Sequence, residues 1–318
     1  MLVRLRDMAM STRAFLVLVA CTLAPSACQS QVAQHSDSMA RAFSTRSGKS
    51  SQVCVRPAGD PSCHRLTSRT SAWQDAAVIS PDGRLVAYSV SDDPLTRSEI
   101  WVSQLDGSRA HRVSGPDEDA LMPAFGADKY TLFYMKSGSF GHSSPIAASR
   151  RHKFDVERVT LNDSGAANGP PTQLTKQELY DVGSLALSPD GKSFLLTVGR
   201  YPIGAVIEEY DVIAPEKIRK TYQPHVTGEP SMGAQFGQAA YLNDGLEIVF
   251  TAATAGDMYD YNVYEMSGVT GANLVALTHG KGMLESLTVD RDDAIFFVRD
   301  GHHFKLDPKT HTMSEERL

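Results

Sequence analysis

Short hydrophobic runs separated by turn-forming residues recur along the chain. ISPDGRLVAYSV begins at Ile79, and LSPDGKSFLLTV begins at Leu187. In both, Ser-Pro-Asp-Gly follows an apolar residue and precedes a run that alternates or is apolar, as in a strand of a packed sheet. Proline presets the backbone angle at the second turn position, and glycine fits the fourth. Each stretch is therefore predicted to be two strands joined by a tight turn.

The turns recur at a regular interval. Gly83 and Gly191 are 108 residues apart, and Gly245, in a turn of Asn-Asp-Gly, lies 54 residues further on. Between the first two stands AFGADKYTLFYM, which begins at Ala124, and a weaker last copy is LTVDRDDAIFFV, which begins at Leu287. A single turn recurring by chance would not give this spacing.

Each copy continues with a second pair of strands. EIWVSQLDGSRAHRVS follows the first copy from Glu99, and NVYEMSGVTGANLVALT follows the fourth from Asn262. Repeating units with four short strands each indicate an all-β fold, a β-propeller of four-stranded antiparallel blades. Six blades are expected, with five as the alternative. The sixth would come from QVCVRPAGDPSCHRLT, which matches the second half of a unit, with residues 41–47 as a candidate additional strand.

These repeats resemble those of TolB-type propellers, and similar repeats occur in the propeller domains of prolyl-oligopeptidase relatives. The resemblance rests on SPDG before an apolar strand and on the tails ending in HRVS and VALT, and it covers about residues 53–318. It implies a periplasmic or surface-attached binding scaffold. TolB carries an additional N-terminal domain that contacts its partners. This chain has only a short segment there, so the resemblance implies no particular partner.

The N-terminal residues have the pattern of an export signal. Arg4, Arg6 and Arg13 precede the apolar run AFLVLVACTLA, which is too short to span a bilayer. Small residues follow, and the segment resembles a bacterial lipoprotein signal, which implies that a cysteine is lipidated. Cys28 is favoured and Cys21 is the alternative; an ordinary secreted protein is the remaining interpretation.

Three parts of the chain are expected from these patterns. Residues 1–27 form the signal peptide, residues 28–52 form a flexible tether, and residues 53–318 form the propeller. The tether is predicted because seven serines and few large apolar residues leave little surface to bury. Export places Cys54 and Cys63 in an oxidising compartment, and they flank a hairpin turn, so we predict a disulfide. A metal pair is the alternative, but no second pair with zinc spacing accompanies them.

Charge and composition limit the classes of partner. The 318 residues are 42% hydrophobic and 21% charged, with a net charge of −6, as in a soluble globular protein. The absence of a strongly basic region argues against nucleic acid. The expected partner is a cell-envelope protein or glycan, with the membrane surface reached through the N-terminal lipid. The expected location is the periplasmic side of the envelope, at the outer membrane more than elsewhere, with secretion as the alternative.

The candidate site lies on one face of the propeller. The connections between the second and third strands of a blade, and those between blades, are longer and more irregular than the SPDG turns, and function concentrates on such loops. The segment 136–153 is the longest. The candidate binding residues in these connections are Asp92, Arg97, His142, Arg151, Tyr201, Asp257, Tyr259 and His279.

The sequence contains no recognisable catalytic motif. It has no Gly-x-Ser-x-Gly elbow, no His-Glu-x-x-His helix and no phosphate-binding loop. His302 and His303 are adjacent in a strand and should point to opposite faces. A binding module without cofactor or metal is therefore favoured over an enzyme. The alternative is a metal-dependent polysaccharide lyase, similar to the oligogalacturonide lyases, with His142, His225 and His279 at the propeller axis.

Overall fold

The computed structural model describes residues 40–47, 50–58, 62–66, 73–92, 96–140, 151–200, 203–226, 235–253 and 260–316. Contacts divide the chain into Met1–Ser36 and Asp37–Leu318, and the strands belong to the second unit. Blade 1 holds β1 (Arg41–Ser47), β2 (Ser50–Arg56) and β3 (His64–Arg65). Blade 2 holds β4 (Trp73–Ile79), β5 (Leu85–Ser91), β6 (Glu99–Gln104) and β7 (His111–Arg112).

Four further blades follow in chain order. Blade 3 holds β8 (Asp119–Phe125), β9 (Thr131–Phe140), β10 (Arg151–Thr160) and β11 (Thr172–Gln173). Blade 4 holds β12 (Val182–Leu187), β13 (Ser193–Arg200), β14 (Gly204–Asp211) and β15 (Ile218–Tyr222). Blade 5 holds β16 (Phe236–Tyr241), β17 (Glu247–Ala253), β18 (Tyr261–Ser267) and β19 (Val275–Ala276). Blade 6 holds β20 (Leu284–Val289), β21 (Ile295–Arg299), β22 (His302–Asp307) and β23 (Thr312–Glu316).

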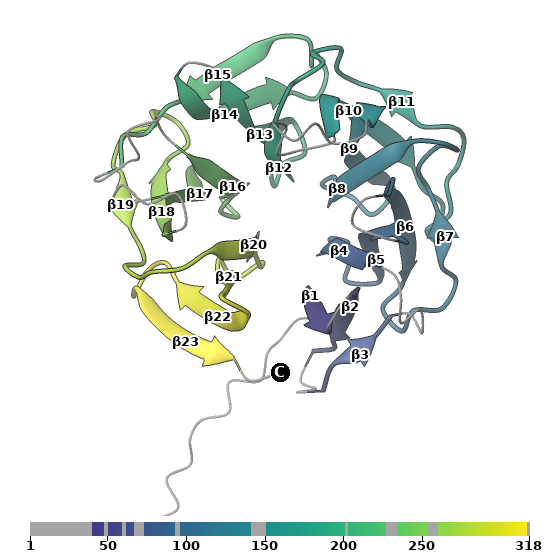
Figure 1. Ribbon diagram of the computed structural model, residues 1–318, viewed down its shortest axis with the longest axis horizontal. Helices are drawn as coiled ribbons and strands as arrows, with labels where there is room; N and C mark the ends of the chain where they lie inside the picture. The colour runs from purple at the N-terminus through teal and green to yellow at the C-terminus, as the bar shows by residue number, and fades with distance from the viewer. Residues whose placement is uncertain are drawn as a thin grey trace, which may run out of the picture. The chain divides into compact units, whose positions relative to one another are not determined.

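The six blades surround a common axis (Figure 1). Blades 2 to 6 each have four antiparallel strands, named a to d from the axis outwards, while blade 1 shows three strands in the described residues. Blade 1 joins blade 2 through one parallel pair, Ser51 with Trp73. The prediction of a six-bladed β-propeller is confirmed.

The Ser-Pro-Asp-Gly turns are equivalent atom by atom. The Ser80 hydroxyl donates to Asp82 at 2.7 Å and accepts the Leu85 N–H at 2.9 Å. In the second copy the Ser188 hydroxyl donates to Asp190 at 2.7 Å and accepts the N–H of Ser193 at 3.0 Å. Gly83 and Gly191 have φ of 72° and 68°, a region that favours glycine. The repeat seen in the sequence is therefore a repeat of hydrogen bonds.

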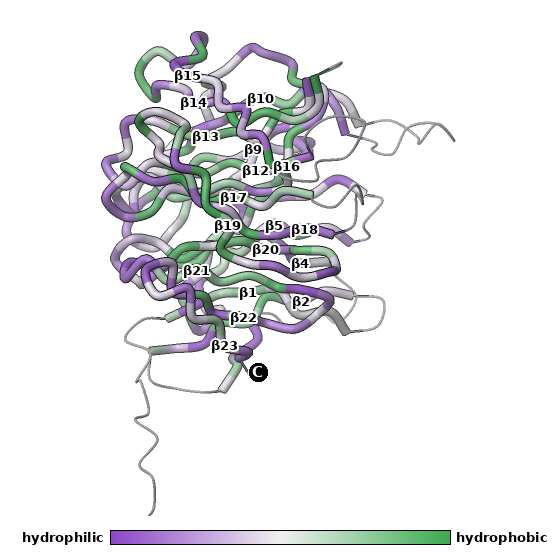
Figure 2. Tube along the Cα trace, turned by 90° about the vertical axis from the view of Figure 1, so that its left-hand side faces the viewer, coloured by the Kyte–Doolittle hydropathy of each residue, from purple (hydrophilic) through white to green (hydrophobic). Residues whose placement is uncertain are grey.

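Hydrophobic clusters join each blade to the next along the chain. Ile207, Phe236 and Phe250, for example, pack blade 4 against blade 5. Equivalent clusters lie between blades 1 and 2, 2 and 3, 3 and 4, and 5 and 6. Figure 2 shows hydrophobic residues along the strands and hydrophilic residues in many of the turns. None of these five clusters, as far as the described residues show, joins blade 6 to blade 1.

The contact between blades 6 and 1, here called the seam, uses charged and aromatic side chains. Glu316 of β23 pairs with Arg41 of β1 and lies 3.7 Å from Arg56 of β2. The Phe43 and His303 rings meet edge to face, with centroids 4.9 Å apart. Burial lowers the pKa of His303; Glu316 opposes this, and the two arginines act with burial. A neutral imidazole therefore adds no third positive charge to the seam at pH 7.

The propeller begins before residue 53. β1 and the first three residues of β2 lie inside the segment that was expected to be a tether. Blade 2 satisfies polar groups at the start of β2: the Ser51 hydroxyl donates to the Gln74 carbonyl at 2.9 Å, and the Gln74 side chain accepts the Val53 N–H at 3.1 Å. Ser51 is fully buried. Polar composition therefore hid a strand that side-chain hydrogen bonds hold in place.

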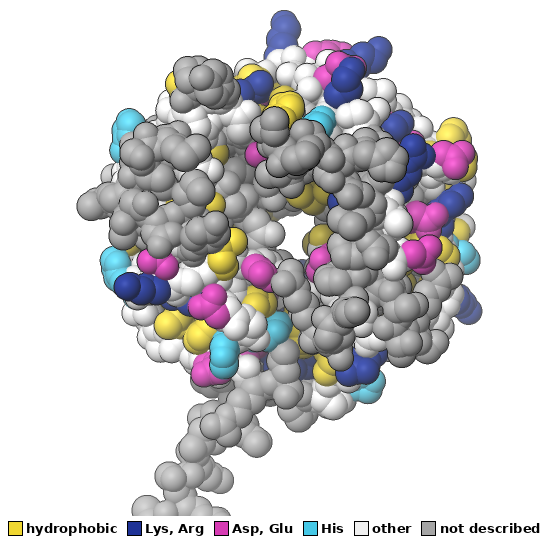
Figure 3. All heavy atoms as spheres, in the orientation of Figure 1, with side chains coloured by type: hydrophobic (Ala, Val, Ile, Leu, Met, Phe, Trp, Pro, Cys, Tyr) yellow, Lys and Arg dark blue, Asp and Glu magenta, His cyan; other side chains and the backbone are white. Residues whose placement is uncertain are grey.

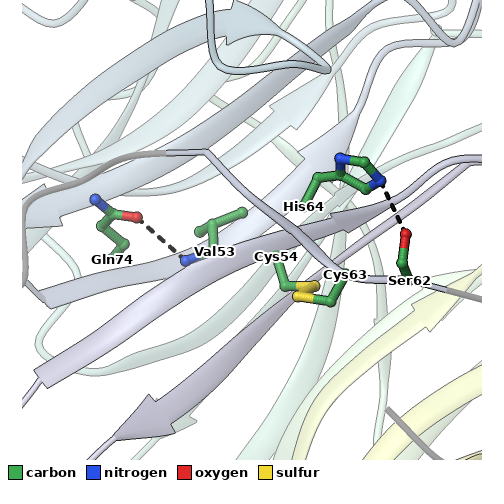
Figure 4. The surroundings of a disulfide bond; sticks show 6 residues. All are labelled: Val53, Cys54, Ser62, Cys63, His64 and Gln74. Atoms are coloured by element: carbon green, nitrogen blue, oxygen red, sulfur yellow. Dashed lines mark hydrogen bonds between the residues drawn. A yellow bond between two sulfur atoms is a disulfide. The ribbon is translucent and has the colours of Figure 1, made fainter.

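The predicted disulfide between Cys54 and Cys63 is confirmed, with Cα atoms 5.6 Å apart (Figure 4). It links buried β2 to the exposed residue that precedes β3. The signal peptide and the candidate lipidation sites, Cys21 and Cys28, lie outside the described residues. No helix within the described ranges has the length and hydrophobicity needed to cross a membrane.

Glu316→Gln is expected to lower the Tm by roughly 4–8 °C, because it removes the carboxylate that Arg41 and Arg56 share. The cost is about 2 kcal/mol, less than for a fully buried pair, because these side chains retain 7–17% exposure. Thermal unfolding followed by circular dichroism would measure it. The matched control is Glu315→Gln, whose exposed pair with His302 contributes at most about 1 kcal/mol. Equal losses in the two variants would contradict a closing role for Glu316.

Candidate functional site

The innermost strands surround an axial channel of about 1010 Å³. Figure 3 looks down the ring and shows its opening, with hydrophobic and acidic side chains nearby. The lining is mixed. Leu121, Leu185 and Leu287 supply apolar surface, while Asp75 and Glu285 supply exposed carboxylates. A channel of this size and polarity suits a polar ligand or an inserted loop.

Each innermost strand of blades 2 to 6 is interrupted by an irregularity at a similar place. In β4, β8 and β20 it coincides with a residue of positive φ: Ala76 at 51°, Met122 at 54° and Ser286 at 58°. In β12 and β16 glycines stand nearby, and a Cβ on Gly183 would lie 2.4 Å from the Gly237 carbonyl oxygen. These bulges change the direction of side chains next to the channel.

Hydrogen bonds between blades fix the innermost strands. The Ser184 hydroxyl of β12 accepts the Ala239 N–H of β16 at 3.1 Å. The Gln238 side chain of β16 accepts the Leu287 N–H of β20. The channel wall in blades 4 to 6 is therefore continuous across the blade boundaries.

Two of the predicted residues converge where blades 2 and 3 meet. The Arg151 guanidinium donates to Asp119 at 2.8 Å and to the Thr96 carbonyl at 2.9 Å. Asp119 also accepts the Ser98 N–H at 2.9 Å. Arg97 donates to the Asp117 carbonyl at 2.7 Å and remains exposed. Asp119, with 1% side-chain exposure, therefore joins the b–c connection of blade 2 to the start of strand c in blade 3.

A second charged group lies beside it. Lys136 is 3.1 Å from Glu118 and 3.2 Å from Glu157, and the Tyr134 hydroxyl donates to Glu118 at 2.9 Å. Burial would lower the pKa of Lys136, but its bonds to the two carboxylates outweigh burial and raise it. Burial, and then the Glu118 carboxylate, raises the pKa of Tyr134. Lys136 and Tyr134 thus stay protonated at neutral pH.

A smaller cavity of about 320 Å³ opens over this region. Its lining includes Arg97, Asp117, Glu118, Asp119 and Lys136. The cavity therefore presents charges of both signs around a space large enough for a side chain.

Of the predicted residues that the structure describes, two border a cavity and two do not. Arg151 also borders the axial channel, and Arg97 borders the smaller cavity. Asp92 follows β5, and His279 lies between β19 and β20; both are exposed and border neither cavity. Another four lie outside the described residues: His142, Tyr201, Asp257 and Tyr259.

Sequence reasoning missed the carboxylates that hold this region together. Asp119, Glu118 and Glu157 were not candidates, because a lone acidic residue at a strand end or inside a strand carries no signal of its own. The run Pro-Asp-Glu-Asp from Pro116, directly after the second half of a repeat, was the available signal.

The histidines proposed as metal ligands are not brought together in the part of the chain that the structure describes. His225 and His279 are exposed on different connections, and His142 lies outside that part. No group of three or more His, Cys, Asp or Glu side chains within it is placed to hold a metal ion. His302 is exposed and bonds Glu315 at 2.8 Å, whereas His303 contacts Phe43, so the two point to opposite faces as predicted.

No known family and no curated protein matches the sequence. Among solved structures, TolB from Acinetobacter baumannii superposes with a TM-score of 0.59 at 14% identity, covering 87% of this chain and 63% of TolB. The chain thus spans less than two thirds of that protein. A putative TolB from Agrobacterium tumefaciens gives 0.52 at 19% identity, over 76% of this chain and 81% of the other. Its structural neighbours are TolB proteins and other β-propellers.

Two other solved structures also superpose on this chain. A chain of a nidogen/laminin complex gives a TM-score of 0.62 at 9% identity, over 88% of this chain and 94% of the other. An oligogalacturonate lyase in complex with manganese gives 0.56 at 14% identity, over 87% and 73%. At these identities the likeness concerns the fold alone, so function must be argued from this chain's own residues.

The stability of the Glu157→Gln variant, relative to that of the wild type, is expected to increase as the pH rises from 4 to 8. Burial, opposed by Lys136 and assisted by Glu118 and Asp155, raises the Glu157 pKa. A carboxylate with a raised folded-state pKa destabilises the fold when it ionises, so this penalty is absent at low pH and appears as the pH rises.

Thermal unfolding of both proteins across this range would measure the effect. The difference in Tm, variant minus wild type, should be more positive at pH 7.5 than at pH 4. Glu216→Gln, at an exposed loop position, is the control and should give a difference that is constant with pH. A Glu157→Gln difference that falls with rising pH would show that ionised Glu157 stabilises the fold.

Proposed function

We propose that this chain is an exported, lipid-anchored β-propeller that binds a protein of the cell envelope through the face formed by its b–c and d–a connections. The observation that carries the proposal is the junction of blades 2 and 3. There Asp119 fixes two connections in place, and exposed Arg97 stands at the edge of a charged cavity. A rigid scaffold that presents irregular, charged connections is the usual arrangement of a recognition surface.

The charge pattern favours a folded protein as the partner. Arg97 and Lys136 stand among Asp117, Glu118 and Asp119, so the surface presents both signs at short spacing. Complementary charges of this kind set the orientation of a partner and the rate of association. Arg97 has a planar group with several donors, and such arginines often anchor interfaces. A uniform glycan would not offer a matching pattern of positive and negative charges.

The lyase alternative draws on the manganese-bound neighbour and on loop histidines. His225 and His279 are the candidate ligands that the structure describes on the proposed binding face, and both are exposed. Metal analysis of purified protein decides between the two functions. A stoichiometric metal that is lost in His279→Ala would contradict the binding module and favour the lyase.

Arg97→Glu is expected to weaken recovery of the partner at least tenfold in a crosslinking pull-down from intact cells. The substitution places a negative charge beside Asp117 and removes a donor from the cavity edge, and loss of a central interface anchor often exceeds 2 kcal/mol. The control is Arg84→Glu, which makes the same charge change in an exposed a–b turn on the opposite face. Equal recovery of the partner with both variants would show that the interface lies elsewhere. Capture of a glycan alone would contradict the proposal that the partner is a protein.

Acyl-chain labelling is expected to modify the mature protein at Cys28. Cys28→Ser should abolish the label and release the protein from the membrane fraction, because a diacylated cysteine anchors a chain without a spanning helix. Cys21→Ser serves as the control and should keep the label. Loss of the label only in Cys21→Ser would show that Cys21 is the lipidated residue. An unlabelled wild type would show an ordinary secreted protein.

A further inference from the structure

The connection between β11 and β12, which joins blade 3 to blade 4, is held firmly against strand c of blade 3. Leu179 of this connection exchanges two backbone hydrogen bonds with Phe154 of β10, at 2.8 and 3.0 Å, and both side chains are buried. The Asp155 carboxylate accepts the Thr175 hydroxyl at 2.9 Å and the Gln177 N–H at 2.7 Å. Asp155 is itself buried, so these bonds are largely shielded from water. The residue that follows Leu179 therefore starts from a fixed backbone.

That residue is Tyr180, which has one ring face covered and the other open. Its ring lies against the imidazole of His152, with centroids 4.3 Å apart and planes inclined by 15°. The His152 Nδ1–H donates to the Tyr180 carbonyl at 3.2 Å, since a carbonyl oxygen can only accept. Tyr180 is nevertheless 68% exposed, and its hydroxyl has no hydrogen-bond partner among the described residues. The ring is thus a fixed and exposed aromatic surface.

Two residues next to this stack have left-handed backbone angles. Lys153 has a φ of 60° and Glu178 has a φ of 47°. Such angles are strained for residues with a side chain, and strain of this kind concentrates at functional sites. Lys153 and Glu178 form an ion pair at 3.2 Å, but both side chains are more than half exposed, so the pair adds little stability. The backbone strain therefore indicates a surface that is fixed in advance of binding.

Asp181 adds a negative charge directly after the stacked tyrosine. Its carboxylate is exposed and forms no ion pair or hydrogen bond within the described part of the chain. A Cβ on Gly199 would lie 3.2 Å from this carboxylate, so the lack of a side chain at Gly199 leaves room for it. Burial, and then the charge of Asp181, raises the pKa of Tyr261 in blade 5. Two nearby cations, Arg151 and Lys153, already have carboxylate partners.

We propose that Tyr180 and Asp181 receive a basic segment of the partner protein, with an arginine side chain packed flat on the open face of the Tyr180 ring. This inference rests on the proposed function and names the partner's chemistry at the same face. The face of an aromatic ring attracts a cation, and a guanidinium group is planar and stacks on it. The exposed carboxylate next to the ring and the chain's net charge of −6 both favour a basic partner.

The site is continuous with the surface around Arg97. Arg151 and His152 are consecutive residues at the start of β10. Arg151 bonds Asp119 where blades 2 and 3 meet, at 2.8 Å. His152 stacks on Tyr180 where blades 3 and 4 meet. One strand end therefore fixes both junctions, and a single partner can contact Arg97 and Tyr180 together.

The direct test is an NMR titration of the full chain with the peptide acetyl-Gly-Arg-Gly-amide. The Tyr180 ring signal, identified by its absence in Tyr180→Phe, should shift on binding. Tyr180→Ala should weaken binding about two- to fivefold, the effect of an exposed cation–π contact, whereas Tyr180→Phe should bind like the wild type. Tyr130→Ala is the matched control, because Tyr130 is an exposed tyrosine in an a–b turn on the opposite face, and it should bind like the wild type.

The charge of the site is tested in the same titration. A peptide with citrulline in place of arginine should bind at least twofold more weakly, because citrulline is similar in shape but neutral. Asp181→Lys should also weaken the binding of the arginine peptide, since it reverses the charge beside the ring. Glu216→Lys makes the same change in an exposed c–d turn on the opposite face and should leave binding unchanged.

The partner itself is tested in the crosslinking pull-down from intact cells. Tyr180→Ala should lower recovery at least fivefold, as expected for an aromatic anchor, and Tyr180→Phe should keep it. His152 positions the ring, so His152→Ala should lower recovery, whereas His152→Phe retains a stacked ring and should restore most of it. Unchanged recovery with His152→Ala would show that the stack does not position the anchor.

The outcomes distinguish this inference from the proposed function. Loss of recovery with Arg97→Glu but not with Tyr180→Ala would retain the binding module and overturn the site at Tyr180. Unchanged recovery with both variants would overturn both proposals. No shift of the Tyr180 signal, or equal binding of the arginine and citrulline peptides, would overturn the basic partner. A shift with cellohexaose but not with the arginine peptide would show instead that the ring binds a glycan.

Discussion

Glu316, held between Arg41 and Arg56, joins the last blade to the first and so closes the ring. The other five boundaries bury hydrophobic clusters between blades that are consecutive along the chain. The seam brings together residues 275 positions apart and relies on charges of limited exposure. Such a contact is directional, and it therefore fixes the angle between blades 6 and 1 more than it adds to total stability.

The candidate face follows from the same architecture. Strands a to d alternate in direction, so the a–b and c–d turns share one face and the b–c and d–a connections share the other. Repeated hydrogen bonds in the Ser-Pro-Asp-Gly turns make the first face uniform. On the second face each connection is different, and Asp119 shows how a buried carboxylate can hold two of them together. Residues on this face can vary without disturbing the core, which is why we propose that recognition takes place there.

The sequence predicted the features that repeat and missed those that do not. Turn residues such as Asp82 and Gly83 act locally, so their spacing revealed the blades. Ser51 in β2 is polar yet fully buried, and its partner Gln74 lies on another blade, so composition indicated a tether instead of a strand. Arg151 was recognised as a candidate, but its bond to Asp119 depends on the packing of blades 2 and 3. Contacts between loops leave no periodic pattern.

The position of β1 also decides how the molecule bears mechanical load. The chain enters the described fold at β1, and seven residue pairs with β2 and the contact with Glu316 tie that strand to the ring. A pull applied to the chain at the start of β1 would act on these bonds first. Blades 3 to 5 lie away from the point where this tension enters. The ring would therefore yield by parting at the seam, while the connections around Asp119 kept their arrangement.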